Sequence, residues 1–249
     1  MTKTGAIILA AGKGKRMKSK ISNKVTMKLG DKPMVMHAVE LLEGMKVIPI
    51  VIVVGFAKDS VKNLFDGSVV FAEQKKRLGT AHAAHQGVKV LSPSTENVYV
   101  LNGDDSAFYT KDILEKLYKT HEANRNAVTI LTLKVADPGG LGRIIRGKNG
   151  EISAIVEEKD ATDAQRKISE INPGCYLFSV AFLKKYLPKV KKSSVTKEYY
   201  LVSLIDLAVK NGEKVDAILC GNIIWRGVNT KDELETAEKL FKKHLKSFA

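Results

Sequence analysis

The sequence contains little cysteine, few aromatic residues and no long apolar run. Its two cysteines, Cys175 and Cys220, lie far apart and match neither a disulfide framework nor a metal-ligand spacing. We expect both to be buried as small apolar residues. The longest strongly apolar stretch, residues 47–56, is far shorter than the roughly 20 residues that a membrane-spanning helix needs. The sequence therefore predicts no membrane segment and a buried strand in this stretch.

Acidic residues are the minority charge. The chain has 27 Asp and Glu against 41 Lys and Arg, a formal net charge of +14. The basic residues are scattered, and no aromatic residues alternate with them to form a base-stacking platform, so nucleic acid is not the expected partner. A basic field of this kind would instead attract triphosphates and sugar phosphates. Residues 1–5 lack the pattern of a secretory signal, so we expect a cytoplasmic protein.

The spacing of apolar residues predicts alternating strands and helices over the first half of the chain. Apolar runs at 5–11, 48–54, 69–72 and 98–101 indicate strands, and helical spacing is found at 33–44, 59–65 and 80–90. Such alternation is typical of βαβ units, and the run 48–54 is apolar on both faces, as in a central parallel strand. Residues 1 to about 135 are therefore expected to form a doubly wound, mainly parallel α/β core.

The pattern changes after residues 138–140. Short strands are indicated at 142–146, 152–157 and 174–178, with a charged break at 159–167. Residues 136–230 are therefore expected to form a smaller, β-rich half that faces the first. Residues 231–249 should contribute a terminal packing helix at 232–246. Because neither an internal repeat nor a linker is visible, we expect a single domain over residues 1–249.

A glycine-rich basic loop directly follows the first strand. It consists of Ala10, Ala11, Gly12, Lys13 and Gly14 and leads into Arg16. Glycines let the backbone approach a phosphate, so that amide groups point at its oxygens while lysine and arginine add charge. The spacing differs from the P-loop, which ends in Lys-Ser/Thr, and from the dinucleotide fingerprint, which has a third glycine. The loop is therefore predicted to bind phosphate.

Together with later motifs, this loop resembles the sugar-phosphate nucleotidyltransferases. The similarity is greatest to the uridylyltransferase domain of bacterial N-acetylglucosamine-1-phosphate uridylyltransferase. The matching segments follow one another in order from about residue 5 to 240, at residues 9–17, 23–25, 30–34, 73–74, 78–83, 103–104, 141–144, 155–157, 159–161, 170–172, 198–201 and 227–229. The resemblance implies a Rossmann-like sheet of the GT-A type flanked by helices, with a smaller sugar-binding β lobe.

The resemblance also implies a reaction. A sugar 1-phosphate oxygen attacks the α-phosphorus of a nucleoside triphosphate, and pyrophosphate leaves in line. Because two polyanions meet, catalysis depends on positioning and charge neutralisation. The family pattern assigns Arg16 and Lys24 to the phosphates, and Asp104 with Asn229 to Mg²⁺, which prefers hard oxygen ligands. Asp105 departs from the family, which usually has an apolar residue there; we expect it to be a turn residue that caps a helix.

The resemblance assigns Gln74 and Gly79 to the base. An amide donates and accepts hydrogen bonds at once, and a glycine leaves its backbone open, as reading a uracil edge requires. UTP is therefore the expected nucleotide, and Gly103 and Thr80 complete the predicted nucleotide-binding set. Thr80 is equally expected to be a plain helix N-cap. His82 and His85 have a spacing that zinc sites use, but no third ligand is apparent, and we expect core or surface histidines.

The family's sugar-binding positions match Gly142, Glu157, Asn172 and Asn229, which implies N-acetylglucosamine 1-phosphate as the acceptor. Three departures adjoin this side of the site. Asn102 stands where an aromatic residue usually precedes Gly-Asp, Pro173 replaces a threonine, and Val202-Ser203 replace Thr-Asp. The acceptor therefore stays open among N-acetylglucosamine, glucose and other hexose derivatives.

Two other functions stay open beside a uridylyltransferase. One is a thymidylyl- or cytidylyltransferase acting on another phosphate monoester, and the other is a non-catalytic relative that binds nucleotides or nucleic acid. The presence of Arg16, Lys24, Asp104 and Asn229 together favours an enzyme, because a binder does not need the whole transfer constellation. The chain ends about where bifunctional relatives begin an acetyltransferase β-helix, so neither acetyl transfer nor the trimerisation supplied by that domain is expected. The sequence predicts no oligomeric state.

Overall fold

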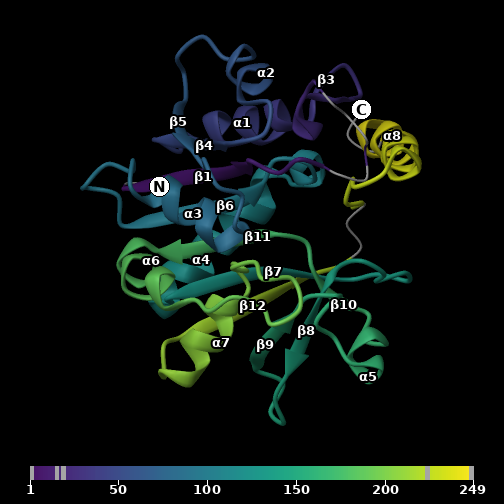
Figure 1. The fold of residues 1–249 in the computed structure, drawn as a ribbon. Coiled ribbons are helices and arrows are strands. Elements are labelled where there is room, and N and C mark those ends of the chain that lie inside the picture. Colours follow the sequence, from purple (N-terminus) through teal and green to yellow (C-terminus); the bar gives the residue numbers. More distant parts are fainter. Residues whose placement is uncertain (1–2, 15–16, 18–20, 222–224, 247–249) are drawn as a thin grey trace.

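A computed structural model describes residues 3–14, 17, 21–221 and 225–246, with side chains as far as residue 243. One mixed sheet runs through the whole molecule (Figure 1). Its strand order is β5-β4-β1-β6-β11-β7, β12 pairs with the far side of β7, and β10-β8-β9 branch from β7. The strands are β1 (Thr4–Ala10), β4 (Ile50–Val54), β5 (Val70–Glu73), β6 (Asn97–Asn102), β7 (Val128–Lys134), β8 (Gly142–Arg146), β9 (Ile152–Val156), β10 (Glu170–Asn172), β11 (Cys175–Ser179) and β12 (Val215–Cys220).

The strands β5, β4, β1 and β6 are parallel and covered by helices on both faces, which confirms the doubly wound core. Side chains alternate across a strand, so that Ala6 and Ile8 of β1 face one core layer while Ile7 faces the other. The first layer contains α1 (Met34–Gly44), α2 (Lys58–Lys62), α4 (Lys111–Asn124) and α8 (Lys231–Lys246). The second contains α3 (Thr80–Val88), α6 (Val180–Tyr186) and α7 (Ser203–Lys210).

The second half is predominantly antiparallel. β11 is antiparallel to β6 and β7, and β10, β8 and β9 are antiparallel to one another, while β12 is parallel to β7. The charged break contains the short helix α5 (Asp163–Arg166), which the sequence interpretation missed. Thr162 begins α5 with a capping box: its hydroxyl accepts the Gln165 amide and the Gln165 side chain accepts the Thr162 amide.

The terminal helix α8 turns back onto the first half of the chain (Figure 1). Phe241 makes edge contacts with the rings of His37 on α1 and Phe108, and Glu238 accepts the Gly30 amide. The short elements around this contact are η2 (Lys24–Thr26), β2 (Lys28–Leu29), β3 (Lys32–Pro33) and η3 (Ser106–Phe108), and η4 (Leu187–Lys189) follows α6. The predicted packing helix is confirmed, and its partners come from the first half of the chain.

Two expectations about apolar residues can be compared with the structure. No helix within the described ranges is long and apolar enough to cross a membrane, and residues 50–54 form the fully buried strand β4. Cys175 is buried as expected, and burial raises the pKa of its thiol well above the usual range. Cys220 is only half-buried, because β12 has a single strand neighbour, β7, and its thiol is free. The prediction that both cysteines are buried is wrong for Cys220.

Candidate functional site

The predicted phosphate, base and metal residues lie at one edge of the sheet. Parallel strands end at the same edge, and β1, β5 and β6 end beside the glycine-rich loop, Gln74 and Gly103 respectively. The Gly103 amide donates to Leu9 O at 3.0 Å, which holds the turn after β6 against the end of β1. The topology therefore brings residues far apart in sequence to a common place.

Asn23 holds the glycine-rich loop in shape. This residue is buried, and its Nδ2 donates to Ala10 O at 2.8 Å, to Gly12 O at 3.2 Å and to Phe56 O at 2.8 Å. Its Oδ1 accepts the Val25 amide at 3.1 Å. Sequence reasoning quoted Asn23 in a matching motif but gave it no role, because its partners are backbone atoms that only the fold brings near.

The loop itself is open to solvent where phosphates would approach. Gly12 and Lys13 are exposed, the Lys13 ammonium lies 5.5 Å from the centre of the Phe56 ring, and Gly14 lies against the Lys24 side chain. Ala10 and Ala11 are buried at the end of β1 and anchor the loop. Arg16, predicted at the departing phosphates, lies outside the described residues.

Lys24 brings three predicted residues together. Its side chain is 11% exposed and pairs with Asp104 Oδ2, and its ammonium also donates to Asn229 Oδ1 at 3.2 Å and Val228 O at 2.6 Å. The oxygens of Asp104 and Asn229 therefore converge on one cation, with the ammonium standing in that position. Hard oxygen donors in such an arrangement suit a divalent cation such as Mg²⁺.

The donor set around Lys24 is small. The described residues contain no group of three or more His, Cys, Asp or Glu side chains that could hold a metal by themselves. A bound Mg²⁺ would thus depend on one carboxylate, one amide and additional oxygens from substrate phosphates and water, which is how proteins commonly hold this ion. The site residues present fit the predicted cofactor.

Gln74 is held in a defined orientation. It is buried, and its Nε2 donates to Gly79 O at 3.0 Å and contacts His82 Nδ1 at 2.9 Å. A backbone carbonyl only accepts hydrogen bonds, so the amide nitrogen must face Gly79 and the side-chain oxygen must face away. Burial lowers the pKa of His82, which favours the neutral ring that can accept this contact. Gln74 therefore presents an acceptor rather than a donor.

Two matching motifs, at 78–81 and 198–201, meet at the start of α3. Leu78 O accepts the Tyr199 amide at 2.7 Å, and Tyr199 O accepts the Ala81 amide at 2.9 Å. Gly79 has φ +108°, and a Cβ there would overlap the Tyr199 backbone, so this approach requires glycine. The Thr80 hydroxyl accepts the Leu201 amide at 2.8 Å, and Gly79 is the N-cap residue of α3. The alternative that Thr80 is a plain helix N-cap is wrong.

The predicted sugar residues lie on the antiparallel half. Asn172 pairs with Gly142 across β10 and β8, and its Nδ2 donates to the Tyr176 hydroxyl at 2.5 Å. Burial, followed by the nearby carboxylates of Asp160 and Glu198, raises the pKa of Glu157 to about 7. Burial, with a smaller contribution from the Glu157 charge, raises the pKa of the Tyr176 hydroxyl. Sequence reasoning missed Tyr176, which carries no motif signal.

Asp105 does not cap a helix, which corrects the sequence-based expectation. It precedes η3, but its side chain makes no capping hydrogen bond. The carboxyl group is instead buried, where Oδ2 accepts Asn102 Nδ2 at 3.2 Å and Oδ1 has no hydrogen-bond partner in the part of the chain that the structure describes. Burial, followed by the Asp104 charge, raises the pKa of Asp105 well above its usual range. Two of the positions that depart from the family pattern therefore contact one another.

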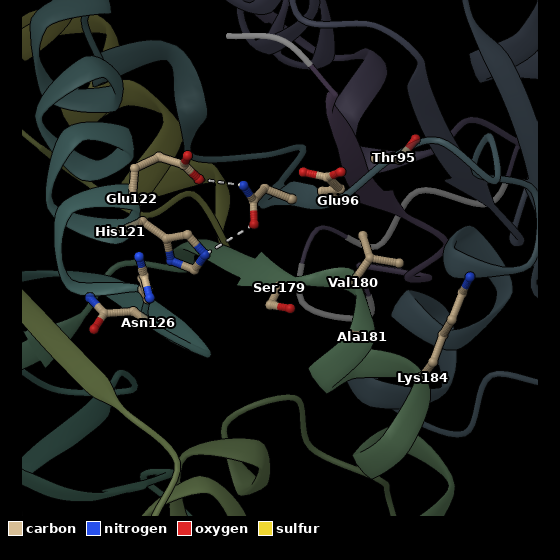
Figure 2. A pocket seen from close by; sticks show the side chains of 11 residues that line it. Thr95, Glu96, His121, Glu122, Asn126, Ser179, Val180, Ala181 and Lys184 are labelled. Carbon is tan, nitrogen blue, oxygen red and sulfur yellow. Dashed lines mark hydrogen bonds between the residues drawn. The ribbon is translucent and has the colours of Figure 1, made fainter.

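A larger cavity, of about 570 Å³, lies at the opposite edge of the sheet, where β6 begins and β11 ends. Its wall contains a hydrogen-bonded chain in which the Asn97 amide connects Glu122 with His121 (Figure 2). Burial lowers the pKa of His121 to about 4, so this ring is neutral. Of the predicted site residues that the structure describes, none lines this cavity. A smaller cavity, of about 350 Å³, includes Asn229, Trp225 and Leu141 and adjoins the candidate site.

Curated proteins from other organisms are similar to this chain over nearly its whole length. The chain is 41% identical over 243 residues to the bifunctional protein GlmU of Caldicellulosiruptor saccharolyticus, which covers 96% of this chain and 52% of that protein. It is 39% identical over 248 residues to GlmU of Brevibacillus brevis, covering 98% of this chain and 53% of that protein. The chain thus spans about half the length of these curated relatives.

A solved structure supports the fold. A Bacillus anthracis protein described as a glucose-1-phosphate thymidylyltransferase, in complex with sucrose, superposes with a TM-score of 0.80 over 96% of this chain and 95% of that one, at 24% identity. The family model described as nucleotidyl transferase matches residues 5–244. By this match over nearly its whole length, the chain belongs to the nucleotidyl transferase family.

Proposed function

We propose that this protein joins a sugar 1-phosphate, with N-acetylglucosamine 1-phosphate as the first candidate, to UTP and releases pyrophosphate. The observation that carries the proposal is the convergence of Lys24, Asp104 and Asn229 beside the glycine-rich loop. The nucleotide would lie on the parallel half, residues 1–135, and the sugar phosphate on residues 136–230. The GlmU relatives support this choice of substrates as well.

The mechanism follows from charge. The backbone amides of the loop at residues 11–14 would bind the triphosphate, and Asn23 keeps these amides in place through three carbonyl contacts. Lys24 would neutralise negative charge that develops as the pyrophosphate departs, and Arg16 would act on the same side. Removing one preorganised charge of this kind costs about 10²–10³ in kcat. Asp104 and Asn229 would hold Mg²⁺, which when bound supplies further neutralisation of the phosphates.

The orientation of Gln74 supports UTP or dTTP over CTP. Its side-chain oxygen faces away from Gly79, and within the described part of the chain no residue donates to it. Uracil and thymine carry a hydrogen on N3 that this oxygen can accept, whereas the N3 of cytosine is itself an acceptor. Two facing acceptors would leave a buried group unpaired, which selects strongly against the wrong base.

Mg²⁺-dependent release of pyrophosphate tests the proposal. The protein is incubated with UTP, dTTP or CTP and a panel of sugar 1-phosphates that includes the N-acetylglucosamine and glucose forms. Release with UTP and one sugar, lost in Asp104→Ala but kept in Asp163→Ala, whose carboxylate is 96% exposed, would support both the reaction and the site. Pyrophosphate release only with dTTP or CTP would show that UTP is the wrong nucleotide in this proposal. No release with any pair would refute the catalytic proposal.

A further inference from the structure

The carboxyl group of Asp105 has no part in the transfer reaction outlined above. It is 8% exposed, and its Oδ1 has no hydrogen bond among the described residues. A buried polar atom without a partner reduces the free energy of unfolding, more so for a group that can ionise. A buried unsatisfied group of this kind calls for an explanation, and the hydrogen bond that Oδ2 accepts from the Asn102 side chain indicates which residue Asp105 orients.

Asn102 lies at the last position of β6, directly before Gly103 and Asp104. The register that pairs Cys175 with Leu101 places Gly174 opposite Asn102. Gly174 has φ +81°, and a Cβ there would overlap the Asn102 amide, so the amide occupies space that only a glycine leaves open. The Gly174 amide donates to Asn172 Oδ1 at 3.1 Å. Asn102 thus lies between the metal-binding Asp104 and the sugar-binding Asn172.

The bond to Asp105 also orients the Asn102 amide. Because Nδ2 is directed to Asp105 Oδ2, the carbonyl oxygen Oδ1 lies on the opposite end of the amide group, away from that carboxyl. The side chain is partly exposed, and no described residue donates to this oxygen. The neighbouring turn is fixed as well, since the Tyr109 hydroxyl donates to Pro173 O at 2.7 Å. The site therefore presents one oriented acceptor beside the predicted sugar residues.

We propose that Asn102 determines acceptor specificity by accepting a hydrogen bond from a hydroxyl or amide N–H group of the sugar 1-phosphate, and that Asp105 is the positioning residue that orients it. The inference rests on the proposed function and deepens it. The acceptor class that fits is a sugar 1-phosphate that carries a hydrogen-bond donor on the side of the ring facing β6. A ring that is deoxygenated or alkylated at that place would pair poorly with the amide oxygen.

Steady-state kinetics with the best substrate pair test the proposal through the KM values of both substrates and kcat. A single neutral hydrogen bond corresponds to roughly a three- to tenfold change in affinity, so Asn102→Ala should raise the KM for the sugar 1-phosphate by that factor. The KM for UTP should change less than twofold. Asp105→Val should raise the same KM, and the double variant should resemble Asn102→Ala alone, because both changes remove one interaction.

Controls separate positioning from a general loss of structure. Asp105→Asn, which keeps an oxygen for the Asn102 amide, should rescue the sugar KM lost in Asp105→Val, and Asp105→Val should raise the urea midpoint. Asn149→Ala removes an exposed asparagine from the β8–β9 turn and serves as the matched variant. An unchanged sugar KM in Asn102→Ala, additive effects in the double variant, or equal rises in both KM values would overturn the inference. If the wild type is inactive with every substrate pair, the proposed function fails, and this inference with it.

Discussion

The Lys24 ammonium stands between the two oxygens that we assign to a metal, and replacing it tests that assignment directly. Lys24→Met keeps the length of the side chain but leaves the Asp104 carboxylate, 20% exposed, without its partner. Removing one partner of a fully buried ion pair costs about 3–5 kcal/mol. Because Asp104 is partly exposed to water, we expect a loss of about 2 kcal/mol in the free energy of unfolding.

Added Mg²⁺ should reverse part of that loss. In Lys24→Met the oxygens of Asp104 and Asn229 are free to take another cation, and binding to the folded state at ten times Kd stabilises by about 1.4 kcal/mol. Wild-type protein without nucleotide should gain much less, since its ammonium competes for the same oxygens. The double variant Lys24→Met/Asp104→Asn should regain stability without Mg²⁺ because it no longer holds an unpaired carboxylate.

Urea unfolding of the three proteins, with and without 10 mM Mg²⁺, measures these effects. Ca²⁺ and high NaCl serve as controls for general ionic effects. The reasoning is wrong if the double variant is less stable than Lys24→Met, or if Mg²⁺ stabilises the wild type as much as the single variant. The first result would show that the Asp104 carboxylate is not left unpaired in Lys24→Met, and the second would place the cation away from Asp104 and Asn229.

Three further changes give independent tests. Asn23→Ala removes the donor to two carbonyls of the glycine-rich loop and to Phe56 O, so the KM for UTP should rise at least tenfold and the free energy of unfolding should fall by about 2 kcal/mol, measured by kinetics and urea unfolding. A normal KM would show that the loop does not depend on Asn23. Glu157 has a raised pKa of about 7, so its neutral form favours folding, and the free energy of unfolding declines as pH rises from about 4.5 to 7. Glu157→Gln should remove about 2 kcal/mol of this decline, measured by urea unfolding across that pH range. Identical pH profiles for the two proteins would contradict the burial argument. Phe241→Ala should lower the free energy of unfolding by about 3–4 kcal/mol, because a ring that is 5% exposed loses its contacts with His37 and Phe108. A loss under about 1 kcal/mol would mean that α8 docks through other residues.

Much of the first half of the fold follows from apolar periodicity. The run 48–54 predicts a strand buried on both faces, and β4 is fully buried. Periodicity was less useful in the second half, where strands are short and the sheet branches at β7. The sequence interpretation missed α5 because its four residues are mostly exposed and carry no apolar stripe, and only the Thr162 capping box marks it. A search for capping pairs would have found this helix.

The sequence predicts those residues of the candidate site that stand in a recognisable motif. It does not predict residues whose place in the site depends only on contacts made in the folded chain. Lys24, Asp104 and Asn229 stand in three separate motifs, and the structure brings them together. Tyr176 belongs to no motif, and its neighbours are defined by the pairing of β11 with β6 and β7. Asp105 was expected to be a turn residue that caps a helix, but it is buried and its Oδ2 accepts the Asn102 amide, a contact that no motif indicates.

The return of α8 to the first half has a consequence for the order in which the protein becomes active. Lys24 bonds Val228 and Asn229 across more than 200 positions of chain, so these contacts close one of the longest loops in the molecule. Contacts of such long range form late in folding, since the intervening chain must be ordered first. A nascent chain can therefore complete its parallel sheet while the site still lacks Asn229. Substrate turnover would begin only after the residues just before α8 have docked beside Lys24.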